Sequence, residues 1–418
     1  MASRMTSATP AERAFPMGER QFVAMMASFQ ALQALAIDAM LPALGEMSRD
    51  LAVTDANHRQ LVIGIFLIAS GLGSLFPGSL ADRFGRRRVI FACLGGYVFF
   101  NLAATVTTEF NTLLIMRGLC GLTTAGLIVV SSAIIRDRFA GDKMARTQSL
   151  VSMIFMVVPM IAPSVGQAVL ALAGWRSIFG VMALLGCGVM AWAWFRLPET
   201  LHPEFRQPIN LSAIAGNMRI ALINRASIGY VFSMALVQGA LFGYINSSQQ
   251  LVAEHFELGD AFPLFFGAMA LCMAIANLAN SRVVMRFGAR RVSHAALIGY
   301  IALAGLQLWF ASRGDETIWE FAPVMTLNMC LMAFIGSNFS SIALQPFARI
   351  AGAAASVQVF LRMVIGSVLG ALIGQAFDGT ARPLAAAMLV AGVASLLLVL
   401  FSERGKLFRR LHGQVQQA

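Results

Sequence analysis

Asp38 is the one among the 20 acidic residues that lies well inside an apolar run, because no other charged residue occurs between Gln21 and Gly45. A charged side chain at the centre of a helix in a membrane costs about 2.5–3.5 kcal/mol on insertion scales. Protonation of the carboxyl group removes that charge and its cost. Asp38 can therefore alternate between a protonated form, which is neutral, and an ionised form, which attracts a positively charged or hydrogen-bonding partner. The alternative is a static ion pair with Arg117 or Arg362.

Arg117 is a permanent positive charge inside another apolar run. It shares a helical face with Gly121 and Thr124, which follow it by four and seven positions. A guanidinium does not lose its proton in proteins. We therefore expect Arg117 to face a cavity and to pair with Asp38, with cargo or with backbone carbonyls. The alternative is a shallow position from which the side chain snorkels to the membrane surface.

Arg362 is the third charged residue inside an apolar run, and it follows Gln358 by four positions, so the two share a helical face. Arg362 either contacts anionic or carbonyl-rich cargo or neutralises Asp38. The four-residue spacing continues in three glycines, which predict close helix packing: Gly366, Gly370 and Gly374.

A polar group closes the seventh apolar run. Tyr244 and Asn246 open a stretch that continues to Gln250, and Gln238 precedes them. This pattern predicts an outer gate or a hydrogen-bonding surface for cargo. The alternative is an amphipathic helix end at the level of the lipid headgroups.

The sequence indicates no catalytic or metal-binding set. Each of the five cysteines stands alone inside an apolar run, so neither a zinc site nor a disulfide framework is indicated. The sequence contains no phosphate-binding loop and no nucleophile-elbow motif. We therefore predict that the protein is not an enzyme, that it holds no metal or cofactor, and that an ion gradient supplies its energy.

The elements that must position these side chains are long apolar helices. Of the 418 residues, 58% are hydrophobic and 12% are charged, whereas a soluble domain is about 45–50% apolar and about 25% charged. This composition excludes an ordinary soluble enzyme and a disordered chain. We predict twelve membrane-spanning helices, near residues 21–45, 59–80, 89–107, 112–135, 147–172, 176–195, 226–249, 261–281, 292–311, 318–341, 351–376 and 383–402.

The distribution of Lys and Arg predicts how these spans are oriented. With the N-terminus in the cytoplasm, most of the 31 basic residues fall in cytoplasmic segments. This bias is typical of the positive-inside rule, so we expect both termini in the cytoplasm. It also accounts for the net charge of +11, and we expect a lipid bilayer and not nucleic acid as the partner. The external loops hold only Arg49, Arg59, Arg176, Arg313 and Arg382.

The two halves of the chain repeat each other. Residues 83–89, after the second span, and residues 286–292, after the eighth, agree at six of seven positions. Such a repeat predicts two six-helix bundles with a binding site between them. We expect a cytoplasmic tail at 1–20, bundles at 21–195 and 226–402, a cytoplasmic linker at 196–225, and a second cytoplasmic tail at 403–418.

Three stretches of the sequence resemble motifs of the major facilitator superfamily. The run from Gly78 to Arg88, Gly-Ser-Leu-Ala-Asp-Arg-Phe-Gly-Arg-Arg-Arg, resembles motif A of that family. Arg117-Gly-Leu-Cys-Gly121 resembles the motif that begins with a membrane-embedded arginine. Ala-Pro163-Ser-Val-Gly166-Gln resembles the antiporter motif, from which its first and last residues depart.

The resemblance also implies roles for individual residues. In motif A it implies a conformational latch, in which Asp82 pairs with Arg136, with Arg138 or with the start of the eleventh span. In the antiporter motif it implies a hinge at Pro163 and Gly166, and it gives Arg117 a part in proton coupling. The latch comprises Gly78, Asp82, Arg83, Gly85, Arg86 and Arg87, and the expected proton and substrate set is Asp38, Arg117, Gln238, Tyr244, Asn246, Gln358 and Arg362.

Further stretches resemble the bicyclomycin/chloramphenicol-resistance branch of the drug:proton antiporters: residues 37–42, 174–179 and 197–200. The resemblance implies a monomeric, multi-pass protein of the bacterial inner membrane that exports small drugs in exchange for protons by alternating access. One aspartate against two arginines would leave its cavity positive, which disfavours multiply cationic dyes and better fits neutral, zwitterionic or anionic cargo. We expect neutral or weakly charged antibiotics such as phenicols or bicyclomycin. The altered antiporter motif leaves open a transporter of a native metabolite (a sugar, amino acid or organic anion), working by symport or export.

Overall fold

The structure, a computed structural model, describes residues 17–55, 57–139, 141–201, 223–259 and 261–408, together with positions 204, 216 and 219 of the linker. In this part of the chain the regular elements are helices, with no strands. Long helices are expected in lipid, because they satisfy all their backbone hydrogen bonds internally. Among the described residues, 11 helices are long and apolar enough to cross a membrane, or up to 12 if one bent pair counts as a span. The predicted all-α fold with twelve spans is confirmed.

The first bundle contains six spans, and two of them consist of more than one helical piece. In chain order its elements are α1 (Glu19–Asp38), η1 (Leu41–Ala43), α2 (Leu44–Asp50), η2 (His58–Gln60), α3 (Leu61–Gly73), α4 (Pro77–Phe84), α5 (Arg86–Thr105), α6 (Phe110–Arg138), α7 (Gly141–Ala173) and α8 (Trp175–Arg196).

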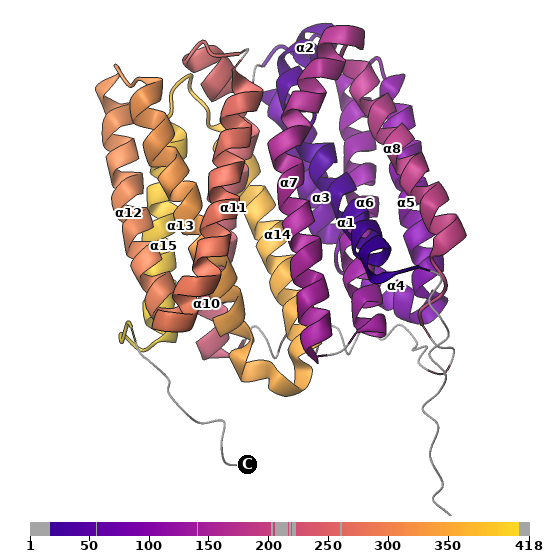
Figure 1. The fold of residues 1–418 in the computed structure, drawn as a ribbon. Coiled ribbons are helices and arrows are strands. Elements are labelled where there is room, and N and C mark those ends of the chain that lie inside the picture. The colour runs from indigo at the N-terminus through magenta and orange to yellow at the C-terminus, as the bar shows by residue number, and fades with distance from the viewer. Residues whose placement is uncertain are drawn as a thin grey trace, which may run out of the picture.

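The second bundle follows the linker and lies beside the first (Figure 1). Its elements are α10 (Arg225–Gln249), the π-helical η4 (Gln250–His255), α11 (Phe262–Phe287), α12 (Ala289–Arg313), α13 (Ile318–Leu344), η5 (Gln345–Ile350), α14 (Ala351–Gln375) and α15 (Arg382–Ser402). The predicted tails at 1–20 and 403–418 and the predicted linker at 196–225 fall largely outside the described residues.

Prolines divide the two spans that were predicted at 21–45 and 59–80. Pro42 has no N–H to donate to the carbonyl of Asp38, so α1 ends there and the chain continues through η1 and α2. Pro77 begins α4 in the same way, and α4 is bent from the preceding helix by 47°. Both segments also extend further than predicted, to Asp50 and Phe84. The first break places Asp38 at a helix end.

Small residues allow α14 to approach its neighbours closely. A Cβ atom on Gly370 would overlap Phe242 of α10, and one on Gly366 would lie 3.1 Å from Cγ of Gln238. A Cβ atom on Gly374 would overlap the side chain of Gln60 in the first bundle. The packing role predicted for these three glycines is confirmed.

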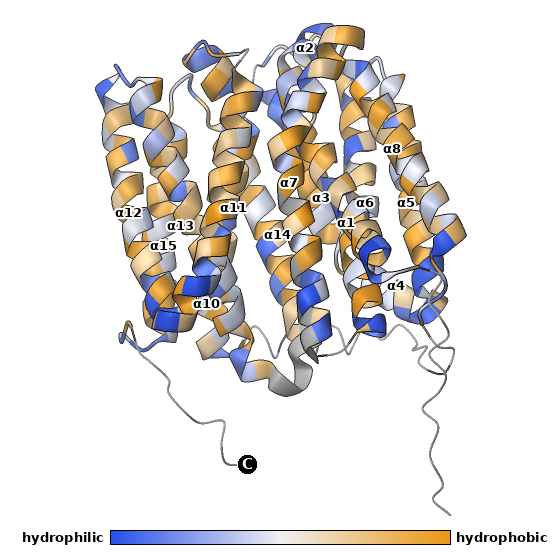
Figure 2. Ribbon diagram, viewed as in Figure 1, coloured by the Kyte–Doolittle hydropathy of each residue, from blue (hydrophilic) through white to orange (hydrophobic). Residues whose placement is uncertain are grey.

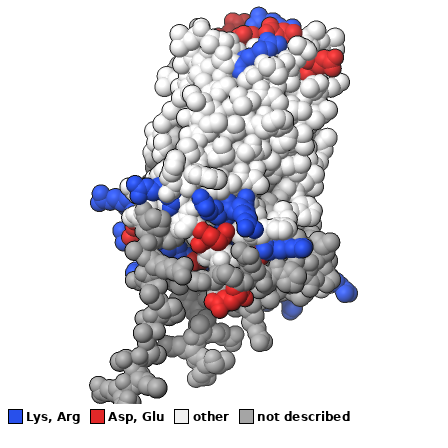
Figure 3. Space-filling model, turned by 90° about the vertical axis from the view of Figure 1, so that its right-hand side faces the viewer, with Lys and Arg blue, Asp and Glu red and all other residues white. Residues whose placement is uncertain are grey.

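Charged side chains gather at the two ends of the molecule, and an apolar belt lies between them. Figure 2 shows hydrophobic residues along the middle of the helices, and Figure 3 shows the belt as a zone without charged residues on one face. We call the end at which α1 begins and α15 ends the basic end. It carries the arginines of α4, the start of α5 and the start of α12. The other end carries Arg49, Arg59, Arg176, Arg313 and Arg382, and we call it the opposite end.

Candidate functional site

Asp38 lies at the break between α1 and η1, with its side chain only 4% exposed. Among the residues that the structure describes, neither Arg117 nor Arg362 forms an ion pair with it; Arg117 and Arg362 instead bond to other groups. The static ion pair that the sequence left open is therefore not formed in this structure. A buried carboxyl group without a counter-ion is most stable when it is protonated.

Arg117 holds the broken end of α1 in place. Its side chain is 1% exposed, so it does not snorkel. Nη2 donates to the carbonyl of Ala36 at 2.7 Å, and Nε donates to the carbonyl of Val62 at 3.2 Å. The guanidinium carbon lies 4.4 Å from the centre of the Phe66 ring. Carbonyls in the last turn of a helix have no hydrogen-bond donor within that helix. Arg117 supplies a donor to one of them, the carbonyl of Ala36, two residues before Asp38.

The antiporter-motif glycine packs against the residue that follows Asp38. A Cβ atom on Gly166 would overlap the carbonyl oxygen of Ala39 and lie 2.8 Å from its carbonyl carbon. Pro163 lies inside α7, as does Pro159, and each removes a backbone donor from that helix. The structure thus places the motif at the broken end of α1. Motion at the proposed hinge stays a prediction.

A cavity of about 340 Å³ lies within the second bundle, in the half nearer the basic end. Three of the predicted residues line it, namely Gln238, Gln358 and Arg362. Nη1 of Arg362 donates to Oε1 of Gln238 at 3.4 Å, and Nε2 of Gln358 contacts the sulfur of Met234 at 3.1 Å. Asp38 and Arg117 are not among the lining residues. The predicted set of one aspartate and two arginines does not line this cavity, and Arg362 is the one charged residue among its described lining residues.

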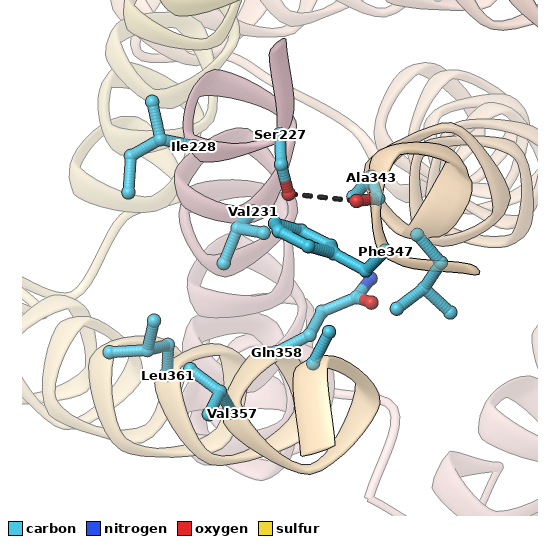
Figure 4. A pocket seen from close by; sticks show the side chains of 10 residues that line it. Ser227, Ile228, Val231, Ala343, Phe347, Val357, Gln358 and Leu361 are labelled. Atoms are coloured by element: carbon cyan, nitrogen blue, oxygen red, sulfur yellow. Dashed lines mark hydrogen bonds between the residues drawn. The ribbon is translucent and has the colours of Figure 1, made fainter. Parts of the chain in front are cut away.

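Gln358 also lines a second, much smaller cavity of about 10 Å³. Figure 4 shows this space between α10, α13 and α14, with the hydroxyl of Ser227 donating to the carbonyl of Ala343. Its other walls are almost entirely apolar, with Phe347 and Leu361 among them. A space of this size has room for about one water molecule, so the larger cavity is the one that can hold cargo.

Several lining residues were not predicted from the sequence. Asn277 of α11 and Ser337 and Ser340 of α13 reach the larger cavity, and so do three methionines. A single polar residue in an apolar span also occurs in helix packing. The one feature in the sequence that could have pointed to the cavity is that these polar residues all lie in the half of their span nearest the basic loops.

Tyr244 and Asn246 lie away from this cavity. The hydroxyl of Tyr244 contacts the sulfur of Met269 at 3.1 Å, and its ring stacks on Phe266. Asn246 is 1% exposed, its amide has no hydrogen-bond partner in the structure, and it lies beside Gly374 of α14. The seven residues of the predicted proton and substrate set therefore do not form one site, and only Gln238, Gln358 and Arg362 share a cavity.

Polar residues join the two bundles at the opposite end, and we call this group the clasp. Arg59 forms an ion pair with Glu254 at 2.6 Å, and Gln60 is hydrogen-bonded to Gln250. The side chain of Asn57 donates to the carbonyls of Gln375 and Phe377, at 3.1 and 2.8 Å. Gln250 belongs to the stretch predicted as an outer gate. Its partner Gln60 lies at the start of the span predicted at 59–80, and its partner Asn57 lies in the loop before that span.

Motif A forms a network within the first bundle. Nη1 of Arg86 pairs with Asp82 at 2.6 Å, and Nε pairs with Asp137 at 3.0 Å. Glu199 accepts hydrogen bonds from the backbone N–H groups of Arg86 and Arg87, at 2.8 and 3.2 Å. Gly85 has φ +102 and sits so close to the Glu199 carboxylate that a Cβ atom would overlap it.

Asp82 thus pairs with Arg86 in this structure, and among the described side chains no ion pair joins it to Arg136 or Arg138. Arg138 lies over the ring of Phe22, at 4.5 Å from its centre. Arg83 lies over Phe84, and Gly78 packs near Val129. The first side chains of α14 are outside the described part of the chain. The role of motif A as a latch remains a prediction.

Asp82→Asn should slow turnover more than it weakens cargo binding. The change removes one of the two carboxylates that hold Arg86, and Asp137 still holds its Nε. Because Asp82 is remote from the cavity, the cargo Kd should stay within about twofold of wild type. Transport rate in proteoliposomes and chloramphenicol binding in detergent measure the two effects. A changed Kd with a normal transport rate would contradict a latch.

The second bundle contains a comparable network that the sequence did not reveal. Arg290, at the start of α12, pairs with Glu403 at 2.8 Å, and Tyr230 donates to the same carboxylate at 2.7 Å. Burial tends to raise the pKa of Glu403, but hydrogen bonds from Arg290 and Tyr230 outweigh it and leave the pKa below its usual range. His294 is buried beside Tyr230. Both bundles therefore hold their basic end with a glutamate that follows the last helix.

Comparison with known proteins extends over most of the chain. A family model described as the Major Facilitator Superfamily matches residues 26–371. A bicyclomycin resistance protein homolog of Haemophilus influenzae is 29% identical over 91% of this chain and 95% of its own. The multidrug resistance protein MdtL of Klebsiella pneumoniae is 28% identical over 87% of this chain and 91% of its own.

Solved structures share the fold at low sequence identity. A peptide transporter in complex with alafosfalin has a TM-score of 0.73 at 14% identity, over 93% of this chain and 98% of its own. The human organic anion transporter MFSD10 has a TM-score of 0.61 at 16% identity, over 92% of this chain and 100% of its own. At such identity the likeness concerns the fold alone.

Proposed function

The chain belongs to the major facilitator superfamily, and from this premise we propose that it is a proton-coupled exporter of small amphiphilic antibiotics. It is a transporter of small molecules and not an enzyme. Relatives named for bicyclomycin and multidrug resistance support drug export as its task. Neutral or weakly charged compounds such as phenicols or bicyclomycin are the proposed cargo.

The observation that carries the proposal is the state of Asp38. A carboxyl group that is buried at a helix break, with no ion pair among the described residues, can change its charge without first breaking a strong bond. Arg117 and Gly166 hold that break through the residues on either side of Asp38. Protonation of Asp38 would therefore alter the stability of the α1 end, and with it the packing of α7.

We propose that the structure represents the state open toward the cytoplasm. The clasp joins the bundles at the opposite end, whereas the cavity lies in the half nearer the basic end. The positive-inside rule places the basic end in the cytoplasm, and the bacterial relatives support the inner membrane as its location.

A proton gradient supplies enough energy for this task. One proton that enters the cell gains about 2.3 kcal/mol from 100 mV and about 1.4 kcal/mol from one pH unit. Together these amounts support a gradient of about five hundredfold for a neutral solute, since each 1.4 kcal/mol corresponds to tenfold.

Proton flux in proteoliposomes tests the function. Purified protein is reconstituted with an internal pH-sensitive dye, a proton gradient is imposed, and chloramphenicol is added. We expect chloramphenicol to accelerate proton movement above the rate of protein-free liposomes. Absence of any drug response would contradict drug export.

The altered antiporter motif favours one second function, the transport of a native metabolite. Gln167 replaces a glycine of that motif, next to Gly166 at the α1 contact. The same liposomes, tested with sugars, amino acids and organic anions, distinguish the two functions. Proton movement that responds to a metabolite and to no drug would establish the second one.

Glu254→Gln should weaken the clasp, so that a reagent outside the membrane reaches the residues buried behind it more often. The change leaves Arg59, whose side chain is 7% exposed, without its ion pair. A loss of about 1 kcal/mol corresponds to about a fivefold rise in the population of molecules in which the clasp is open. Labelling of an Asn246→Cys variant by an impermeant maleimide should become faster by that factor.

Glu257→Gln provides the control for the clasp, because Glu257 is exposed in the loop after η4 and has no ion pair among the described residues. Labelling should be unchanged in that variant. Equal labelling rates in Glu254→Gln and in the parent would show that the ion pair does not hold the bundles together.

A further inference from the structure

We propose that the larger cavity is a binding site for an organic monoanion, an amphiphile whose carboxylate is recognised by Arg362. The inference rests on the proposed function only in taking this cavity as the cargo site. Arg362 is the one charged side chain among the described residues that line it. A molecule with a negative group is therefore the best electrostatic match.

The guanidinium of Arg362 has unused hydrogen-bonding capacity. Its Nε is buried and has no hydrogen-bond partner in the structure. Among the described residues it makes one hydrogen bond, from Nη1 to Gln238, which is 3.4 Å long, beyond the usual 2.7–3.2 Å. A guanidinium carries five N–H donors in a planar fork that fits a carboxylate. Most of these donors are left for a ligand.

No acidic residue compensates this charge from the cavity wall. The walls are built by α10, α11, α13 and α14, and their described lining residues include no aspartate or glutamate. A cation without a counter-ion in such a place raises the energy of the empty site. Binding of an anion removes that cost, whereas a cationic drug would add to it.

The rest of the cavity fits an apolar body with further polar groups. Asn277 and Ser340 offer hydrogen bonds on the helices that face Arg362. Met234, Met273 and Met332 supply flexible apolar walls, which adapt to ligands of different shape. A volume of about 340 Å³ lies in the range of drug-binding pockets, about 300–1,000 Å³.

A monoanionic cargo also changes the charge that moves in each cycle. Exchange of one entering proton for one leaving neutral molecule moves one positive charge inward. Exchange for one leaving monoanion moves two, so the membrane potential acts on the cycle twice as strongly.

Binding of a matched pair of compounds tests the inference. The probes are nalidixate, an aromatic monocarboxylate, and its neutral methyl ester, added to the purified full-length protein in detergent. We expect wild type to bind nalidixate at least about tenfold more tightly than the ester, the difference that one hydrogen-bonded charge pair produces. Arg362→Gln should lose this preference and keep the Kd of the ester. Arg362→Lys should keep part of it.

Two more variants guard against a simple folding defect. Gln238→Glu places a carboxylate beside Arg362, so it should abolish the preference for the acid while the ester still binds. Arg282→Gln removes the same charge from an exposed position on α11 and should behave as wild type. Equal affinity of wild type for acid and ester, or an acid preference that survives in Arg362→Gln, would overturn the inference.

The outcome is independent of the transport assay, because binding in detergent requires no gradient. If acid and ester bind alike while chloramphenicol still drives proton flux, the anion site is wrong and the exporter stands. If the acid preference is present and depends on Arg362 while no drug moves protons, the anion site stands and the proposed function is wrong.

Discussion

Asp38→Asn should abolish proton-driven export while the protein stays folded and binds cargo. Asparagine has nearly the shape of a protonated aspartate but cannot release a proton. Because the side chain is buried and has no ion pair among the described residues, losing its charge leaves no partner unpaired. We expect drug-dependent proton flux to fall to the level of protein-free liposomes. Thermal stability and the Kd of chloramphenicol should match wild type.

Glu109→Gln is the matched control for this prediction. Glu109 is exposed, and it precedes α6 without a side-chain cap hydrogen bond. The same chemical change there should leave proton flux unaltered. Export by Asp38→Asn at the wild-type rate would remove Asp38 from the mechanism.

Gly166→Ala should disrupt the packing of α7 against the break in α1. The added methyl group would overlap backbone atoms of Ala39, which cannot rotate away as a side chain does. Overpacking of this kind costs about 1–3 kcal/mol. We expect a lower melting temperature in detergent and a strong loss of transport, because the break positions Asp38.

Gly188→Ala is the control, since no atom lies within 4 Å of a Cβ added to this glycine in α8. Alanine favours a helix by about 1 kcal/mol over glycine, so this variant should be at least as stable as wild type. Equal behaviour of the two variants would show that the contact between Gly166 and Ala39 does not matter.

The spans were predictable because hydropathy and length determine which segments cross a membrane. The repeat and the α14 glycines were predictable because their spacing is periodic. The break at Pro42 follows from a missing donor that is also visible in the sequence, yet the span was predicted as a single segment. That break explains why Arg117 bonds to Ala36, since the end of α1 leaves a carbonyl without a partner.

The pairing of charges could not be predicted from the sequence, because it depends on how the helices pack in each bundle and on which face each helix turns toward its neighbours. Asp38, Arg117 and Arg362 are the charges well inside the predicted spans, away from their ends, and the sequence predicted that they form one set. The structure puts Arg117 on backbone carbonyls and Arg362 in the cavity of the second bundle. The clasp was missed because Asn57 and Gln375 come from distant parts of the chain, and such a contact leaves no local pattern.

The most direct test of proton exchange uses a drug gradient as the only driving force. Liposomes that contain the protein are loaded with chloramphenicol and a pH-sensitive dye, and are diluted into drug-free buffer of the same pH. As the drug leaves through an antiporter, protons must enter, so we predict that the lumen becomes more acidic with wild type and not with Asp38→Asn. An alkaline shift, or the same signal from both proteins, would contradict the account.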